Sequence, residues 1–245
     1  MIIDTHCHLD LYERPELIVK ECEEQNILTI EVTNLPSHFE IGFPHVQFCK
    51  KVRLALGMHP LYAHNHEKEF PLFLNNIDKT SYIGEIGLDF SREGISTKEI
   101  QIKIFNKILK SIEGKKKILS IHSRRAEKEV LDLLIKYKIS NAIFHWYAGP
   151  LYLIDKIIEA GYYFSINPAM TKSENGKKII SKIPSYRLLT ESDGPFIKIE
   201  KEVIKPKDVS IVIEYLADTK NNTFLEIEKN IYNNFKTLVS TLKKD

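Results

Sequence analysis

An Asp-x-His-x-His sequence stands near the start of the chain, at Asp4, His6 and His8. Apolar residues lead into it, which favours a strand, and side chains two residues apart on a strand point to the same face. Two imidazoles placed in this way can hold one metal ion from one side, and histidine is the commonest metal ligand. The alternative is a pair of ordinary strand histidines, so the question is whether other parts of the chain supply further ligands.

Ionisable residues also stand within or directly after other apolar runs. Glu85, His122 and His145 interrupt or end three such runs, and Asp193 follows a fourth. A single residue of this kind is usually a hydrogen-bonded loop residue. Burying several of them in apolar strands is costly unless they are paired or bind a metal. Nitrogen and oxygen ligands from five strands together predict a metal centre.

The expected ligands are His6, His8, Glu85, His122, His145 and Asp193. They exceed what one catalytic ion needs, so we expect two divalent ions bridged by a carboxylate, with Mg, Mn or Zn as candidates. Glu85 is the expected bridge because it comes from a middle strand. His6, His8 and Asp193 would hold the first ion, and the two remaining histidines the second. Such a pair of ions clamps a phosphoryl group, and Asp193 could also accept a proton from the attacking water.

The elements that must position these ligands are eight apolar runs that read as parallel strands buried on both faces. They are Ile2–His8, Ile27–Thr33, Arg53–Met58, Tyr82–Leu88, Ile118–Ser123, Ala142–Tyr147, Tyr162–Asn167 and Arg187–Ser192. Amphipathic runs separate them, so the chain of 245 residues predicts an α/β fold of the TIM barrel type, (β/α)8, as one unit over residues 1–245. An open doubly wound sheet is the alternative, but no Gly-x-Gly-x-x-Gly follows the first strand.

Helix boundaries are also readable. Isoleucines recur every four residues over 100–112, and Gly114 suits a helix end. Ser96-x-x-Glu99 and Thr223-x-x-Glu226 read as capping boxes at the starts of two helices.

Composition narrows the class of protein. The formal net charge is only +2, so any binding of a polyanion must come from a local patch or from metals. Three widely spaced cysteines do not make a disulfide scaffold and favour a reduced compartment. His6 lies too near the start for a cleaved leader, and no apolar run reaches membrane-spanning length. We expect a cytoplasmic protein without a membrane segment.

Together the motifs resemble the TatD family of metal-dependent deoxyribonucleases. The resemblance runs in order through 4–9, 84–89, 121–124, His145 and 191–195, and Gln101 and Phe105 also match. It implies a barrel similar to that of amidohydrolases, one or two divalent ions and exonuclease activity on DNA. The residues that match the family's metal ligands are the six named above.

Three loops depart from the usual pattern of that family. His145-Trp146-Tyr147-Ala148-Gly149 replaces a His-Cys-Phe-Ser-Gly sequence, the seventh strand ends differently, and an Arg-Asn-x-Pro segment is missing between 196 and 206. These loops look like the TatD-type nuclease of the Qat anti-phage defence systems. That narrower resemblance implies protein partners from a defence complex.

Residues near the expected ligands are candidates for substrate binding. Arg124 could fork onto a phosphate or be a surface arginine. His59 could touch a phosphate or a carboxylate behind the metals, or cap the turn at Pro60. Of Trp146 and Tyr147, we expect one to face the mouth, where aromatic rings stack on bases, and the other to pack in the core. The lysines between 198 and 207 form a basic loop that could attract a phosphate backbone or simply be solvated.

We therefore expect a divalent-metal-dependent nuclease that cuts phosphodiester bonds in DNA, with single-stranded ends preferred. The alternative is a small-molecule metallo-hydrolase of the amidohydrolase type that acts on an amide, lactone or phosphoester. A non-enzymatic partner in a defence or repair complex is a third reading, which six intact ligands argue against.

Overall fold

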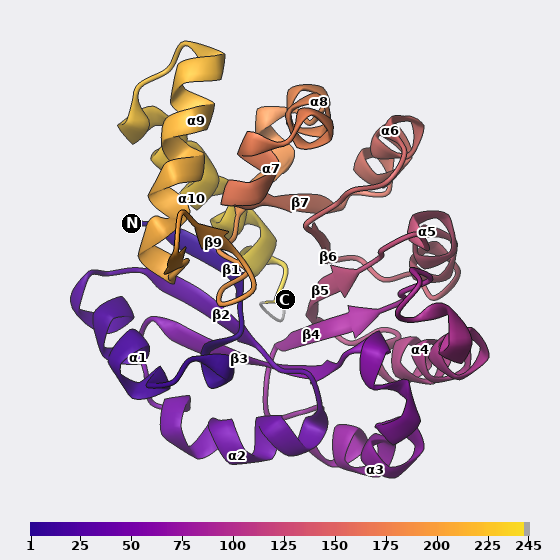
Figure 1. The fold of residues 1–245 in the computed structure, drawn as a ribbon. Helices are drawn as coiled ribbons and strands as arrows, with labels where there is room; N and C mark the ends of the chain where they lie inside the picture. Colours follow the sequence, from indigo (N-terminus) through magenta and orange to yellow (C-terminus); the bar gives the residue numbers. More distant parts are fainter. Residues whose placement is uncertain (243–245) are drawn as a thin grey trace.

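The computed structural model describes residues 1–242, and its central feature is a ring of eight parallel strands in chain order (Figure 1). The strands are β1 (Ile3–Cys7), β2 (Leu28–Val32), β3 (Val52–Met58), β4 (Tyr82–Gly87), β5 (Ile118–His122), β6 (Ala142–His145), β7 (Tyr163–Ile166) and β8 (Leu188–Thr190). The predicted (β/α)8 barrel is confirmed. The last three residues of the expected unit 1–245 lie outside the described residues.

Helices surround the strands, as Figure 1 shows. They are α1 (Pro15–Glu24), α2 (Pro36–Val46), α3 (His66–Asn76), α4 (Lys98–Ile112), α5 (Glu127–Lys136), α6 (Leu151–Glu159), α7 (Pro168–Lys172), α8 (Glu174–Lys182), α9 (Ser210–Lys220) and α10 (Phe224–Ser240). Short 3-10 turns are η1 (Leu9–Leu11), η2 (Pro60–Asn65), η3 (Ile95–Thr97), η4 (Ser185–Arg187) and η5 (Pro206–Val209). No helix within residues 1–242 is long and apolar enough to cross a membrane.

The strands are buried on both faces, which explains why they read as continuous apolar runs. Leu56, Ile83, Ile121 and Phe144 are all fully buried, and they belong to the same hydrophobic core as the inner faces of the helices. A smaller element follows β8. It is a two-stranded hairpin of β9 (Lys198–Ile199) and β10 (Glu202–Val203), which the sequence analysis treated as a loop.

The barrel closes between β1 and β8 through threonine side chains. The hydroxyl of Thr190 donates a hydrogen bond to the carbonyl of Ile3 at 2.5 Å, and the hydroxyl of Thr5 donates to the carbonyl of Thr190 at 3.0 Å. Beyond them, the amide of Asp193 donates to His6 at 2.9 Å and that of His8 to Gly194 at 2.8 Å. These bonds bring both ends of the chain to one edge of the barrel.

Some predicted boundaries are wrong. The predicted capping box of Ser96 and Glu99 is absent. Helix α4 begins at Lys98 after a 3-10 turn, and its N-cap residue Thr97 makes no capping bond to the backbone. The reason is that Ser96, the predicted cap, lies inside η3, so Thr97 takes the N-cap position; its hydroxyl donates to the carbonyl of Gly94 and accepts from the amide of Gln101. The box of Thr223 and Glu226 is confirmed, and so is the left-handed Gly114 after α4, with φ +74°.

Candidate metal centre

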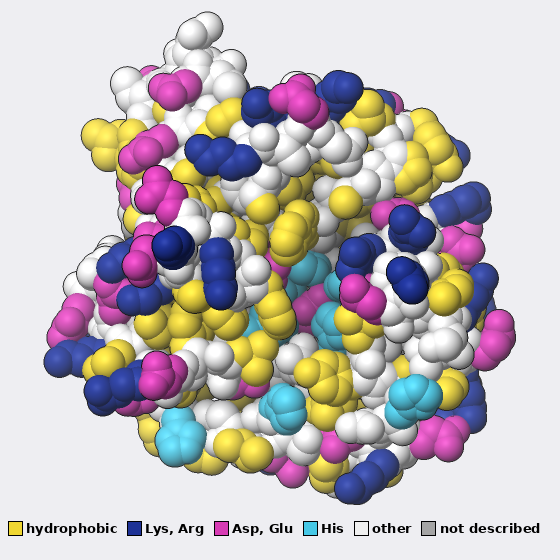
Figure 2. Space-filling model, viewed as in Figure 1, with side chains coloured by type: hydrophobic (Ala, Val, Ile, Leu, Met, Phe, Trp, Pro, Cys, Tyr) yellow, Lys and Arg dark blue, Asp and Glu magenta, His cyan; other side chains and the backbone are white. Residues whose placement is uncertain are grey.

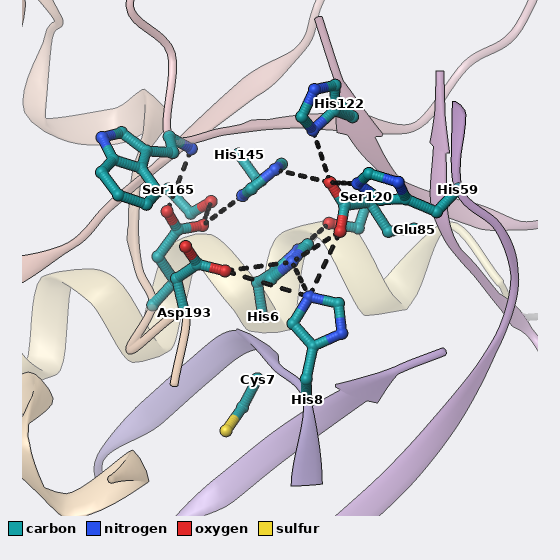
Figure 3. Close-up of polar contacts among 12 residues, drawn as sticks. His6, Cys7, His8, His59, Glu85, Ser120, His122, His145, Ser165 and Asp193 are labelled. Atoms are coloured by element: carbon teal, nitrogen blue, oxygen red, sulfur yellow. Dashed lines mark hydrogen bonds and ion pairs between the residues drawn. The ribbon is translucent and has the colours of Figure 1, made fainter. Parts of the chain in front are cut away.

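Side chains from both ends of the chain and from three middle strands meet at the carboxyl ends of the strands (Figure 3). His6 lies in β1, Glu85 in β4, and His122 and His145 are the last residues of β5 and β6. His8 and Asp193 lie just beyond β1 and β8. The six expected ligands are therefore brought together, and His59 joins them from the turn after β3. We call these seven residues the Glu85 cluster.

Glu85 stands between two groups of imidazoles (Figure 3). Its Oε2 lies 3.2 Å from Nε2 of His8 and 3.4 Å from Nε2 of His6. Its Oε1 lies 2.7 Å from Nδ1 of His122 and 2.9 Å from Nε2 of His145. The side chain of Glu85 is buried. One carboxylate thus faces a histidine group with each oxygen, which is the arrangement expected of a bridging ligand.

Three sets of ligand atoms in the described residues lie close enough to hold an ion. The members of each set are within 4.8 Å of one another: His6, His8 and Asp193; His6, Glu85 and His145; and His59, Glu85 and His122. The first set is the one expected for the first ion. His145 groups with His6, against whose ring it stacks at 3.9 Å, rather than with His122. Imidazole and carboxylate donors of this kind suit Zn, Mn or Fe, and the buried side chains that carry these donors fit such an ion.

Several histidines of the cluster are held from behind through their second ring nitrogen. Nδ1 of His6 lies 2.7 Å from the hydroxyl of Ser120, and Nε2 of His122 lies 2.8 Å from Oδ2 of Asp89. Partners of this kind fix the orientation of metal-binding histidines. The sequence analysis did not name Ser120 or Asp89 as site residues. The available signal was weak: Asp89 ends the apolar run of Glu85, and Ser120 precedes His122 by two residues.

His59 differs from the other histidines in its hydrogen bonds. The backbone N–H of Leu61 donates to Nδ1 of His59 at 3.2 Å, so the neutral ring carries its proton on Nε2. This Nε2 lies 3.2 Å from Oε1 of Glu85. A nitrogen that carries a proton has no lone pair for a metal. His59 therefore acts as a hydrogen-bond donor toward the site, and it also caps the turn at Pro60, as both readings of the sequence expected.

The charges of the cluster depend on each other. Burial by itself raises the pKa of Glu85, but the neighbouring rings of His59, His145 and His6 bring it well below its usual value. Burial lowers the pKa of His145, yet Glu85 and Glu191 raise it well above the ordinary value. Burial raises the pKa of Asp193 well above its usual range. The cluster without an ion thus pairs a carboxylate with imidazolium, and a divalent cation would take over that positive charge.

Glu191 is a buried carboxylate that holds several residues behind the Glu85 cluster through hydrogen bonds. It accepts hydrogen bonds from the backbone of Trp146 at 3.0 Å, from the amide of Asn167 at 2.9 Å and from the hydroxyl of Ser165. Its Oε2 also lies 3.7 Å from Nδ1 of His145. Trp146 has a left-handed backbone with φ +37°, which ends β6 at His145, earlier than the predicted strand 142–147.

The cluster lies at the bottom of a pocket of about 520 Å³. Figure 2 shows this hollow with histidine and acidic side chains at its floor. Arg124, Trp146 and His59, the three expected substrate contacts, all line it. Trp146 is 38% exposed, whereas Tyr147 is buried, so one ring faces the mouth and the other packs in the core, as expected. Arg124 is also an outward-facing side chain that lies 3.4 Å from Glu93.

Phe196 completes the wall of the pocket on the side of β8. It is 60% exposed and its ring meets that of His8 edge-on at 5.0 Å. It was not among the predicted site residues, because a Phe directly after a Gly-Pro pair carries no signal of its own.

Known proteins resemble this chain in both sequence and fold. The chain is 30% identical over 243 residues to an uncharacterized metal-dependent hydrolase of Methanocaldococcus jannaschii, covering 95% of this chain and 94% of that protein. It is 26% identical over 246 residues to human deoxyribonuclease TATDN3, with 92% and 90% covered. The crystal structure of YJJV, a TatD homologue from Escherichia coli, shares the fold with a TM-score of 0.87 at 22% identity, and 97% of each chain is covered.

The profile of the family described as TatD related DNase matches residues 3–240, which is nearly the whole chain. This range includes all seven residues of the Glu85 cluster and the hairpin after β8. On the strength of this match and of the shared barrel, the chain belongs to the TatD-related DNase family of metal-dependent hydrolases.

Proposed function

We propose that this enzyme is a nuclease that uses two divalent ions, Mg, Mn or Zn, to hydrolyse phosphodiester bonds in DNA, starting from single-stranded ends. The observation that supports this most strongly is Glu85, whose two carboxylate oxygens face separate histidine groups at the floor of the pocket. The name deoxyribonuclease of the human relative agrees with it.

The expected metal ligands are those that the sequence suggested. His6, His8 and Asp193 would hold one ion. His122 and His145, which both face Oε1 of Glu85, would hold the other ion, with Glu85 shared. Ions bound there supply Lewis acidity, which lowers the pKa of water and neutralises charge on the phosphate.

The side chains around the ions have separate tasks. Asp193 is the proposed acceptor for the proton of the attacking water, because its carboxylate lines the pocket beside the histidines, with Oδ1 3.6 Å from Nε2 of His6. Glu85 sets the distance between the two halves of the site. The N–H at Nε2 of His59, which faces Glu85 at 3.2 Å, would turn to a phosphate oxygen, and the guanidinium of Arg124 at the rim would pair with the same phosphate. The ring of Trp146 stacks on the base next to the phosphodiester bond that is hydrolysed.

Preference for single strands follows from the depth of the site. Glu85 and Asp193 are almost completely buried, at 2% and 3% exposure, so a phosphodiester must enter the pocket to reach them. A strand end can do so as one nucleotide, whereas a duplex would first have to open.

The test is a cleavage assay with labelled single- and double-stranded DNA in Mg, Mn or Zn and in chelator. We expect metal-dependent cleavage of the single strand and almost none with Glu85→Ala or Asp193→Asn. Equal cleavage by the wild type and both variants would exclude the metal-site mechanism.

One observation favours a second function. The pocket is lined by the carboxylates of Glu85, Asp89, Glu93, Glu127 and Asp193 and by one arginine, Arg124. Without metals such a wall repels a polyanion, so a small neutral amide or lactone is the alternative substrate. Salt separates the two functions, because DNA binding weakens as salt rises and binding of a neutral substrate does not.

We also propose a role in anti-phage defence, with protein partners, in the cytoplasm. The support is the resemblance of the loops after β6, β7 and β8 to the Qat nucleases. Expression of the chain with its neighbouring genes should reduce phage plaques, and Glu85→Ala should restore them. Equal protection by that variant would contradict the proposal.

A further inference from the structure

The hairpin β9–β10 follows the cluster directly, and its register separates its side chains into two faces. Ile199 lies opposite Glu202, and Lys198 lies opposite Val203. Residues opposite each other on neighbouring strands point to the same face, and the faces alternate along each strand. Glu202 therefore shares a face with Ile199, and Lys198 points to the other one.

Burial shows which face is outside. The backbone N–H of Ile204 donates to Ile197 at 3.0 Å, which extends the ladder, and both side chains are buried, with 5% and 3% exposed. Ile197 and Ile204 lie on the same face as Ile199 and Glu202. The isoleucine side of this face packs on the barrel, whereas Glu202 at its end is exposed. The outer face carries Lys198 and, by the same alternation, Lys205. Lys201 is exposed in the turn between the strands.

These lysines have no acidic partner in the part of the chain that the structure describes. Lys198, Lys201 and Lys205 take part in none of the ion pairs found there within 4.0 Å, whereas Lys207 pairs with Glu21 at 2.8 Å. Two glutamates dilute the charge of the hairpin and both are exposed, but Glu200 lies in the turn and Glu202, by its register, shares the face of Ile199 and not that of Lys198. The outer face is therefore basic.

The hairpin is placed beside the mouth of the pocket. Phe196 connects it to Asp193 and is itself part of the pocket wall. Figure 2 shows Lys and Arg side chains on opposite sides of the hollow, over the position of β9 in Figure 1 and over the loops that follow β4 and β5. Arg124 lies in the second group. A polyanion that crosses the mouth meets positive charge on both sides, with Glu93 standing beside Arg124 on one of them.

We infer that the outer face of the β9–β10 hairpin binds backbone phosphates of a single strand outside the pocket. This inference rests on the proposed nuclease function and deepens it. The acidic pocket wall admits the phosphate to be cut, which the ions neutralise, and the hairpin holds the phosphates that remain outside. The substrate is then a strand of several nucleotides rather than a dinucleotide or a small diester.

The test compares the full-length wild type with Lys198→Gln/Lys201→Gln. The matched control is Lys110→Gln/Lys136→Gln, in the last turns of α4 and α5, at the other end of the barrel. Fluorescence anisotropy measures binding of a labelled oligothymidylate of about 20 nucleotides in chelator over a series of salt concentrations. Cleavage with Mn is measured on the same oligonucleotide and on bis(p-nitrophenyl) phosphate.

We expect the hairpin variant to bind the oligonucleotide about tenfold more weakly, with a salt slope less steep by about 1.4, because each phosphate contact to a single strand contributes ~0.7. Its preference for the oligonucleotide over the small diester should fall by a similar factor, and the control should match the wild type. An unchanged salt slope and an unchanged preference would overturn the inference. If the wild type cuts neither substrate, the nuclease function fails, and the anisotropy still decides whether the hairpin binds phosphates.

Discussion

Asp89 holds the imidazole of His122 in place: its Oδ2 lies 2.8 Å from Nε2, while Nδ1 of the same ring faces Glu85 at 2.7 Å. The two carboxylates thus use both ring nitrogens of His122. Burial alone would lower the pKa of His122, but the bonds to Asp89 and Glu85 raise it. The ring is oriented before any ion arrives.

Asp89→Asn should weaken metal binding and activity by about 10–100-fold, the usual effect of losing the group behind a metal-binding histidine. The amide keeps the size of the side chain but removes the charge that orients His122. Titration of Mn with activity as the readout measures the change. Asp132→Asn, an exposed helix residue paired with Lys128, is the control, and equal metal affinity in both variants would contradict the assignment.

Metal binding should also be visible as stability. An ion that binds only the folded state stabilises it by about 2.7 kcal/mol when its concentration is 100 times its dissociation constant. We expect Mn or Zn to raise the melting temperature of the wild type and to have little effect on His8→Ala/Glu85→Ala. Scanning calorimetry with and without chelator measures it, and isothermal titration gives the number of ions, expected to be two. An equal rise in the variant would place the ions elsewhere.

Trp146→Ala should raise the KM for single-stranded DNA by about fivefold or more, because stacking of one base on an aromatic ring contributes ~1–3 kcal/mol. Trp146→Phe should restore most of the loss. Steady-state kinetics on a short labelled strand separates KM from kcat. A loss confined to kcat would show instead that Trp146 acts by holding the backbone next to His145.

Glu31 predicts how stability changes with pH. It lies buried in β2, one of its oxygens has no hydrogen-bond partner, and burial together with Asp10 raises its pKa to about 8. The folded state therefore binds the proton more tightly than the unfolded state, whose pKa is near 4.5. The stability that Glu31 contributes in its protonated form is lost as the pH rises toward 8. Glu31→Gln should remove this fall, and melting temperatures from pH 5 to 9 test it. A fall of the same size in the variant would assign it to other groups.

Thr190→Val should lower the free energy of unfolding by about 1–3 kcal/mol, because it leaves the buried carbonyl of Ile3 without its hydrogen bond. The volume changes little, so packing is preserved. Thr219→Val is the control, since its hydroxyl bonds only to its own helix at the surface. Urea unfolding of both variants measures the difference, and equal values would show that the closure contributes little.

The sequence was sufficient to predict the barrel and the six side chains that meet at its carboxyl end, and the reason is physical. Strands buried on both faces must be apolar, so Glu85 and His122 stood out within their runs. The ends of parallel strands meet at one edge, which brought Asp193 next to His6 without any pairing having to be known.

What the sequence could not show depends on the path of the backbone through turns and, in one case, on a contact between distant segments. The proton position on His59 is set by the backbone of Leu61, and the end of β6 depends on the bond from Trp146 to Glu191. The capping box at 96–99 is absent because Ser96 lies inside the 3-10 turn that precedes α4. In each case the deciding partner lies in a turn or on another element, and local pattern carries no information about it.

The threonine closure joins Thr5 to Thr190, 185 residues apart in the chain. His6 and Asp193 stand directly beyond that closure, on opposite sides of it. During synthesis the first histidines leave the ribosome long before the aspartate that completes their set. The candidate ligand set of His6, His8 and Asp193 is therefore complete only in a chain whose synthesis has passed the last strand.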